Sequence, residues 1–151
     1  MNPKEYIENF NLIDFVKENS EALAPFRLSL EHIAVDFKDV GVIEIIPRRA
    51  SNVDLVLSAG IHGNETAPIE ILSDLVSKIL KQEIVLAANL LVIIGNPKAM
   101  LVQERFTAVN LNRLFNGEWK EFIDEPETEY EANRAKLIEE SVTSFYRQRN
   151  S

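Results

Sequence analysis

A histidine and a glutamate stand three positions apart, His62 and Glu65, shortly after an apolar run that ends at Ala59. Zinc accepts an imidazole nitrogen and a carboxylate oxygen as ligands, and two side chains at this spacing on one turn can reach the same ion. In open α/β sheets, ligands bind beyond the carboxyl ends of the strands. The pair therefore indicates a candidate metal site at the end of a buried strand.

The same turn has a second interpretation that needs no metal. Asn64 could cap the helix that follows, and Glu65 could simply favour the positive helix end. The glycines on either side of His62, Gly60 and Gly63, would let the backbone turn tightly in either case. The local pattern leaves both interpretations open.

A second polar group lies in the loop-like stretch 105–115. Arg113 presents a planar fork that matches a carboxylate, and Asn112 can add an amide donor beside it. Arg105 could instead stabilise negative charge that develops during a reaction. The alternative is that both arginines are solvated or pair with acidic groups, which are numerous in this chain.

Two short apolar segments, 53–59 and 89–95, are typical of strands covered on both faces. Between them, apolar residues recur at helical spacing from Ile69 to Leu80. A strand–helix–strand unit predicts parallel strands joined by a right-handed crossover. The carboxyl ends of both strands, and hence His62, should lie at one edge of the sheet.

The ends of this helix and of the second strand carry turn signals. We expect Asn64 or Thr66 to cap the helix, with Pro68 in its first turn. Asn96-Pro97 should turn the chain at the end of the second strand, and a short helix is expected over 98–102.

The chain should divide into an N-terminal part, residues 1–50, and a metal-site part, residues 51–151. In the first part we expect one or two short helices over 5–22, a strand over 26–37 and an antiparallel strand over 42–47.

The acidic segment 118–131 is interpreted as a solvated loop rather than as a charged surface for a partner. A final helix is expected over 129–147, because four apolar residues fall on one stripe: Ala135, Ile138, Val142 and Phe145.

Composition and charge exclude several classes of protein. With 151 residues, 46% hydrophobic and 26% charged, the chain can form one soluble domain. The formal charge of −8 argues against nucleic acid and anionic membranes as partners. The absence of cysteine excludes disulfides and thiolate ligands. No apolar run approaches the ~20 residues of a membrane span, and the N-terminus lacks a signal-peptide pattern, so we expect a cytoplasmic protein.

Four segments together carry a resemblance, in the order Gly60-Ile61-His62-Gly63-Asn64-Glu65-Thr66-Ala67-Pro68, Gly95-Asn96-Pro97, Arg105, and Asn112-Arg113-Leu114-Phe115. This ordered set resembles the succinylglutamate desuccinylase/aspartoacylase family of zinc hydrolases, and is most similar to its succinylglutamate desuccinylase branch. The resemblance implies an α/β fold, a carboxypeptidase A-like (phosphorylase/hydrolase-like) mixed sheet flanked by helices, incomplete at the C-terminal end.

The resemblance also implies a role for each residue. His62 and Glu65 would be zinc ligands, and Arg105 would polarise the scissile carbonyl. Asn112 and Arg113 would grip a carboxylate of a small acylated amino acid. The implied reaction is hydrolysis of N2-succinylglutamate to succinate and glutamate, in the arginine succinyltransferase pathway of arginine catabolism.

Two parts of the family pattern have no match in the chain: a third zinc ligand, which is a downstream histidine, and a later catalytic glutamate. No histidine follows Arg113, and the one other histidine, His32, falls on a predicted N-terminal strand. We therefore expect the N-terminal half of such an enzyme, inactive alone, whose open sheet edge favours self-association.

Two alternatives to this interpretation remain. The same metal chemistry would serve an aspartoacylase or a peptide carboxypeptidase. A half-length chain could also be a non-catalytic remnant that binds carboxylates or a partner.

Overall fold

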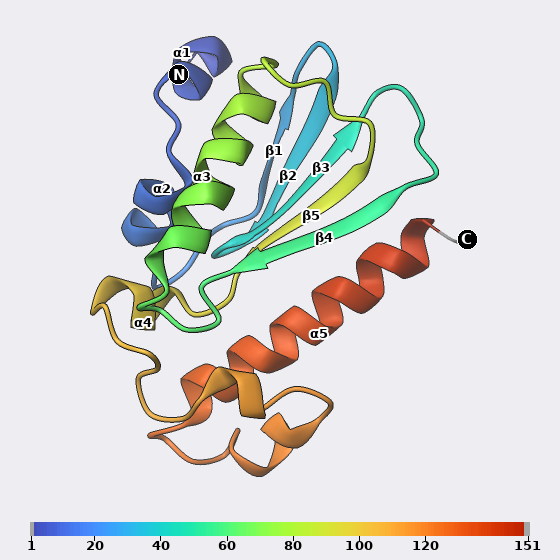
Figure 1. The fold of residues 1–151 in the computed structure, drawn as a ribbon. Helices are drawn as coiled ribbons and strands as arrows, with labels where there is room; N and C mark the ends of the chain where they lie inside the picture. The colour runs from blue at the N-terminus through green and yellow to red at the C-terminus, as the bar shows by residue number, and fades with distance from the viewer. Residues whose placement is uncertain (1, 150–151) are drawn as a thin grey trace.

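The computed structural model describes residues 2–149. Five strands form one mixed sheet in the order β1-β2-β3-β5-β4, with helices on both faces (Figure 1). The expected α/β fold class is confirmed. The strands are β1 (Phe26–Ser29), β2 (Ile33–Asp39), β3 (Val42–Pro47), β4 (Asp54–Ala59) and β5 (Asn89–Ile94).

Three helices pack on one face of the sheet and one long helix on the other (Figure 1). The first group is α1 (Pro3–Glu8), α2 (Leu12–Glu18) and α3 (Thr66–Leu80), and the long helix is α5 (Glu129–Arg149). A short helix, α4 (Pro97–Leu101), and two 3-10 turns, η1 (Leu111–Arg113) and η2 (Glu118–Glu121), lie between β5 and α5. Within residues 2–149, no helix is long and apolar enough to cross a membrane.

The unit β4–α3–β5 has the predicted connectivity, because β4 pairs with β5 in parallel and in register from Asp54↔Asn89 to Ala59↔Ile94. The two strands end together, and the chain remains paired just beyond them. Gly95 donates to the Ala59 carbonyl at 2.9 Å and Asn96 donates to the Gly60 carbonyl at 2.7 Å. The turns that follow β4 and β5 therefore start side by side.

The interior strand β5 is buried along its whole length, because its two faces belong to different apolar clusters. Leu90, Val92 and Ile94 pack with α2 and α3, whereas Leu91 and Ile93 pack with α5. The stripe predicted for α5 is confirmed, since its apolar side chains face this second cluster: Ala135, Ile138, Val142 and Phe145. Because β5 is packed on both faces, the position of its carboxyl end is fixed within the fold.

The single strand expected over 26–37 is wrong. The segment is a hairpin in which β1 pairs antiparallel with β2, and Leu30 donates to the Ile33 carbonyl at 2.9 Å to close it. The partial alternation of apolar residues runs through the turn without a Gly or Pro, so the pattern could not show where the chain reverses. His32 consequently lies in the turn rather than in a strand.

The expectation that β4 is covered on both faces is also wrong. β4 is the last strand of the sheet, and Leu55 is 44% exposed. The cap predicted at Asn64 or Thr66 is wrong as well, because Glu65 occupies the N-cap position of α3 and no side chain caps the helix there. Pro68 does lie in the first turn, as expected.

The acidic segment 118–131 is not uniformly solvated. Glu118–Glu121 forms η2, and Glu131, in the first turn of α5, is fully buried. The interpretation as a solvated loop is therefore wrong for Glu131. Its partners lie in a loop that precedes it in the chain, which a local pattern could not reveal.

Candidate metal site

Two glycines shape the turn that carries His62, for different reasons. Gly60 has φ +69°, a conformation that favours glycine. At Gly63 the reason is space, because a Cβ there would lie 2.2 Å from the carbonyl carbon of Ala99 in α4. The turn after β4 thus packs directly against the helix after β5. This contact holds His62 at the carboxyl end of the sheet.

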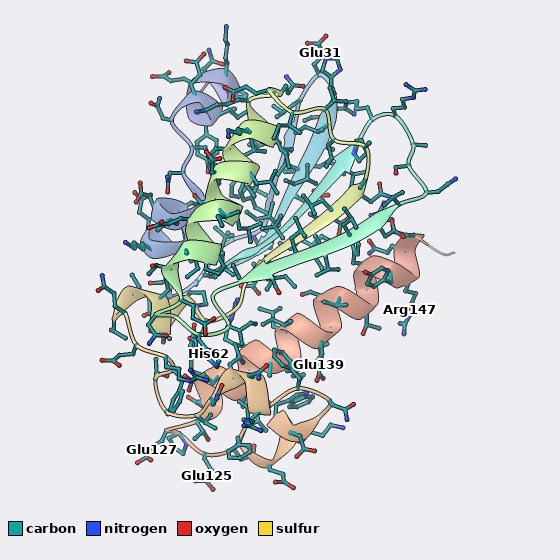
Figure 2. The ribbon with its side chains drawn as sticks, viewed as in Figure 1. Glu31, His62, Glu125, Glu127, Glu139 and Arg147 are labelled. Atoms are coloured by element: carbon teal, nitrogen blue, oxygen red, sulfur yellow. The ribbon has the colours of Figure 1, made fainter. Side chains whose placement is uncertain are left out.

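His62, labelled in Figure 2, lies near the carboxyl end of the sheet. Its ring is between two polar partners. Its Nδ1 is 3.0 Å from Glu65 Oε1, and its Nε2 is 3.0 Å from Asn110 Oδ1. The His62 side chain is only 12% exposed, whereas that of Glu65 is 56% exposed. The histidine ring is therefore held from inside the protein, while Glu65 approaches it from solvent.

The segment 105–113 returns to the His62 turn through its backbone. The Arg105 carbonyl accepts from the Gly63 N–H at 3.2 Å. Asn110 caps η1, and its Oδ1 accepts from the Asn112 N–H at 3.1 Å. The structure thus brings both polar groups that the sequence analysis singled out to one end of the sheet.

The side chains of Arg105, Asn112 and Arg113 are exposed at this end of the sheet. Within the described part of the chain, neither guanidinium takes part in a hydrogen bond or an ion pair. Pairing of these arginines with the acidic residues, the alternative left open by the sequence, is therefore not observed among residues 2–149. Both are available for an anionic ligand.

Glu131 anchors the loop that carries these residues. Its carboxylate accepts from the backbone N–H groups of Thr107, Ala108 and Val109, from the Thr107 hydroxyl at 2.8 Å and from the Asn96 amide at 3.2 Å. Consecutive backbone amides that converge on one anion form a rigid concave cradle. A carboxylate of α5 fills this cradle, so the loop is tied to the helix immediately before Asn110.

The pKa of Glu131 reflects this arrangement. Burial alone would raise the pKa, but hydrogen bonds from Val109, Thr107 and Asn96 favour the charged form more strongly. The net result is a pKa below the ordinary value of 4.5. Glu131 is therefore a carboxylate at neutral pH and acts as a permanent acceptor for the loop.

Arg134, also in α5, ties the end of the sheet to this helix, as Glu131 ties the loop. It is 5% exposed and donates to three carbonyls, those of Gly95 at 2.9 Å, Ile94 at 2.8 Å and Val40 at 2.9 Å. These carbonyls belong to the end of β5 and to the turn between β2 and β3. One side chain of α5 therefore closes the polar end of the sheet beside the candidate site.

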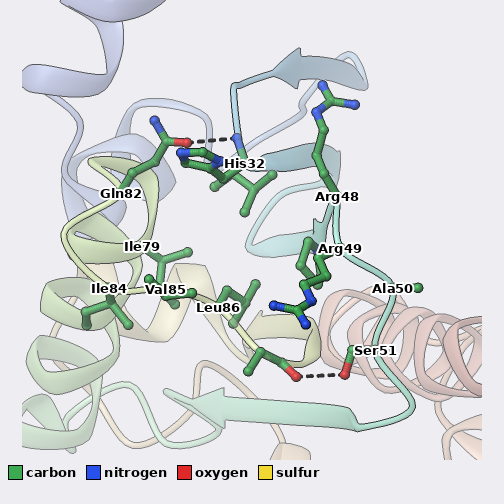
Figure 3. A pocket seen from close by; sticks show the side chains of 13 residues that line it. His32, Arg48, Arg49, Ala50, Ser51, Ile79, Gln82, Ile84, Val85 and Leu86 are labelled. Atoms are coloured by element: carbon green, nitrogen blue, oxygen red, sulfur yellow. Dashed lines mark hydrogen bonds between the residues drawn. The ribbon is translucent and has the colours of Figure 1, made fainter.

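His32 is not part of this site. It lies with Pro47, at the amino ends of β4 and β5, where its backbone N–H donates to Gln82 Oε1 at 2.9 Å (Figure 3). A pocket of about 700 Å³ opens there, lined also by Arg49 and Val85. Because the length of the strands separates this pocket from His62, His32 is not placed to act as a further ligand at the candidate metal site.

Three residues of the site region were missed by the sequence analysis: Asn110, Glu131 and Arg134. Each carried a signal. Asn110 is a preferred helix-capping residue two positions before Asn112. Glu131 and Arg134 continue the apolar stripe of α5 in the N-terminal direction, and a charged residue on a buried stripe must find a partner.

The mixed sheet and the polar turns at the carboxyl ends of β4 and β5 define an α/β protein with a carboxypeptidase A-like fold. The family profile described as "Succinylglutamate desuccinylase/Aspartoacylase catalytic domain" matches residues 51–150. The chain belongs to this family.

Individual relatives support the same assignment. A succinylglutamate desuccinylase of Yersinia enterocolitica is 46% identical over 135 residues, 88% of this chain and 40% of that protein. One of Erwinia tasmaniensis is 43% identical over 108 residues, 72% of this chain and 32% of that protein. The crystal structure of the Chromobacterium violaceum succinylglutamate desuccinylase superposes with TM-score 0.77 at 29% identity, over 90% of this chain and 41% of that one. The chain thus spans about a third to two fifths of these relatives.

Proposed function

We propose that this chain carries part of the active site of a zinc-dependent amide hydrolase that cleaves N2-succinylglutamate into succinate and glutamate in arginine catabolism. The observation that carries the proposal is the 3.0 Å approach of His62 Nδ1 to Glu65 Oε1. The loop that returns to this turn carries Arg105 and Arg113, which form no ion pair with any residue of 2–149. The substrate follows from the relatives, which are named succinylglutamate desuccinylase.

His62 and Glu65 fit zinc as a pair of ligands. Zinc lies about 2.0–2.2 Å from nitrogen and oxygen ligands, so two ligands of a tetrahedral ion stand about 3.4 Å apart. The observed separation of 3.0 Å is close to this value, and the half-exposed Glu65 side chain has room to adjust. Both residues would hold the ion beyond the carboxyl ends of β4 and β5.

The remaining residues supply binding and charge stabilisation. When bound, zinc lowers the pKa of water towards about 7 and so provides hydroxide at neutral pH. Arg105, whose carbonyl is tied to Gly63, would face negative charge on the carbonyl oxygen under attack. Arg113 and Asn112, in η1, would hold a substrate carboxylate through the guanidinium fork and the amide.

Zinc affinity tests this proposal directly. The chain should bind zinc weakly, because two protein ligands leave the remaining positions to water, and His62→Ala should weaken binding by about 10–100-fold or more. Calorimetric titration measures both. His32→Ala is the matched control, since His32 lies at the other end of the sheet. Equal loss in both variants would contradict the assignment.

The two arginines should differ in their kinetic roles in a full-length enzyme that contains this sequence. Arg113→Lys should mainly raise KM, because a carboxylate is held alike in the ground and transition states. Arg105→Ala should mainly lower kcat, by about 10²–10³-fold, if it faces charge that develops in the transition state. Steady-state kinetics decides this. An Arg105→Ala enzyme with unchanged kcat and raised KM would rule out the oxyanion role.

A non-catalytic role in carboxylate binding is the second candidate. It is favoured by one observation: among residues 2–149, no three His, Cys, Asp or Glu side chains are grouped so that they could hold a metal ion. Turnover of succinylglutamate distinguishes the two. Zinc-dependent hydrolysis by a full-length enzyme that contains this sequence, lost in His62→Ala, would exclude this candidate.

A further inference from the structure

We propose that Asn110 is a positioning residue that fixes the ring of His62 with Nδ1 directed at Glu65. The inference rests on the proposed function, because it concerns how a metal ligand is held. It adds a residue outside the ligand pair, from the loop 105–113, and it follows from the hydrogen bonds of that loop.

The orientation of the Asn110 amide is determined by its second partner. The same Oδ1 atom that faces His62 lies 3.1 Å from the backbone nitrogen of Asn112. A backbone N–H can only donate, so the atom that meets it must be the amide oxygen and not the amide nitrogen. The cap of η1 thus fixes which end of the amide faces the histidine.

The amide oxygen in turn determines where the His62 ring carries a proton. Oδ1 of Asn110 only accepts, and it lies 3.0 Å from Nε2, so Nε2 must carry the proton that is donated. In the neutral ring the lone pair is then on Nδ1, 3.0 Å from Glu65 Oε1. Two acceptor atoms at that distance repel unless a proton or a cation lies between them. The ring is therefore set for a cation on its Glu65 side.

The position of Asn110 is itself secured from two sides. The preceding residue, Val109, donates its backbone N–H to Glu131 at 3.0 Å, and the following turn is capped by the Asn110 side chain. The His62 side chain is mostly buried, so water competes little for Nε2. Partners of metal-bound histidines that fix ring orientation are generally worth about 10–100-fold in metal affinity.

The proton on Nε2 can be observed by ¹⁵N-resolved NMR of the metal-free chain. The chain has two histidines, and the exposed His32 is an internal reference. We expect the His62 Nε2 proton to exchange with water more slowly than any ring proton of His32. Asn110→Ser retains a residue that caps η1 but is too short to reach His62, so it should fold and lose this protection. Asn110→Asp, which keeps an oxygen there, should retain it.

Two results would overturn the proposal: an Nε2 without a proton in the unaltered chain, or unchanged protection in Asn110→Ser. Zinc titration is the second measurement. Asn110→Ser should weaken zinc binding about 10–100-fold, whereas the exposed loop variant Asn52→Ala should not; equal affinity in Asn110→Ser would also count against the proposal. A chain that binds no zinc would remove the support for the proposed function, while the Nε2 proton would still decide the role of Asn110.

Discussion

Replacing Glu131 with glutamine should lower the free energy of unfolding by about 3–5 kcal/mol at neutral pH, because a buried network of hydrogen bonds loses its charged acceptor. The carboxylate accepts from five donors, three of them the consecutive backbone N–H groups of Thr107, Ala108 and Val109. A glutamine amide has a single oxygen and would present its own N–H groups to these donors. Urea denaturation measures the change.

Glu129→Gln is the matched control, because Glu129 is exposed in the same helical turn, and it should change the stability by less than about 0.5 kcal/mol. Amide hydrogen exchange at residues 107–109 should rise in Glu131→Gln alone. If both variants were equally stable, Glu131 would not hold the loop.

The effect of Glu131 should depend on pH in a defined direction. Its pKa is lowered in the folded protein, so its stabilisation is fully present above the ordinary value of 4.5 and is lost as the pH falls through the lowered pKa. The difference in stability between the unaltered chain and Glu131→Gln should therefore shrink below pH 4.5. A difference that grows on acidification would show that the charged carboxylate is not the source of the stabilisation.

Replacing Arg134 with methionine should have an effect of similar size, a loss of about 3–5 kcal/mol. Hydrogen bonds to charged groups contribute about 1.5–3 kcal/mol each, and contributions from one side chain are not additive. Methionine fills a similar volume but leaves the carbonyls of Gly95, Ile94 and Val40 without their donor. Urea denaturation again provides the measurement.

Arg134→Lys keeps the charge and can restore part of the loss, although an ammonium group lacks the planar fork that reaches three carbonyls. Arg147→Met is the control on the same helix, because Arg147 is exposed, and should be nearly neutral. A similar loss in Arg147→Met would show that helix propensity, and not the carbonyl contacts, is responsible.

The elements predicted correctly from the sequence are those whose pattern is local. The helical spacing from Ile69 to Leu80 and the apolar segment 89–95 reflect burial along one element, so α3 and β5 were found. The β1–β2 hairpin was missed because its turn lacks Gly and Pro. The exposure of β4 was missed because an edge position is a property of the sheet.

For the candidate site, too, local features could be predicted from the sequence and distant contacts could not. His62 and Glu65 were recognisable because their types and spacing suit a metal, and the structure places them 3.0 Å apart. The residue types of Asn110 and Glu131 suggested a cap and a buried charge, but not their partners, which lie 48 and 22–24 residues away along the chain. A residue's chemistry can be read locally, but its hydrogen-bond partners depend on the tertiary fold.

The contacts of α5 impose an order on the folding of a nascent chain. Domains fold from the N-terminal side during synthesis, and all five strands precede residue 95. The sheet can therefore pair before Arg134 exists, but Val40, 94 residues earlier, lacks its donor until that residue emerges. The carbonyls at the end of the sheet that carries His62 therefore gain the donors of Arg134 only after all the strands have been made. A ribosome-bound chain that stops before residue 131 would thus have a formed sheet whose end beside His62 still lacks the contacts of Glu131 and Arg134.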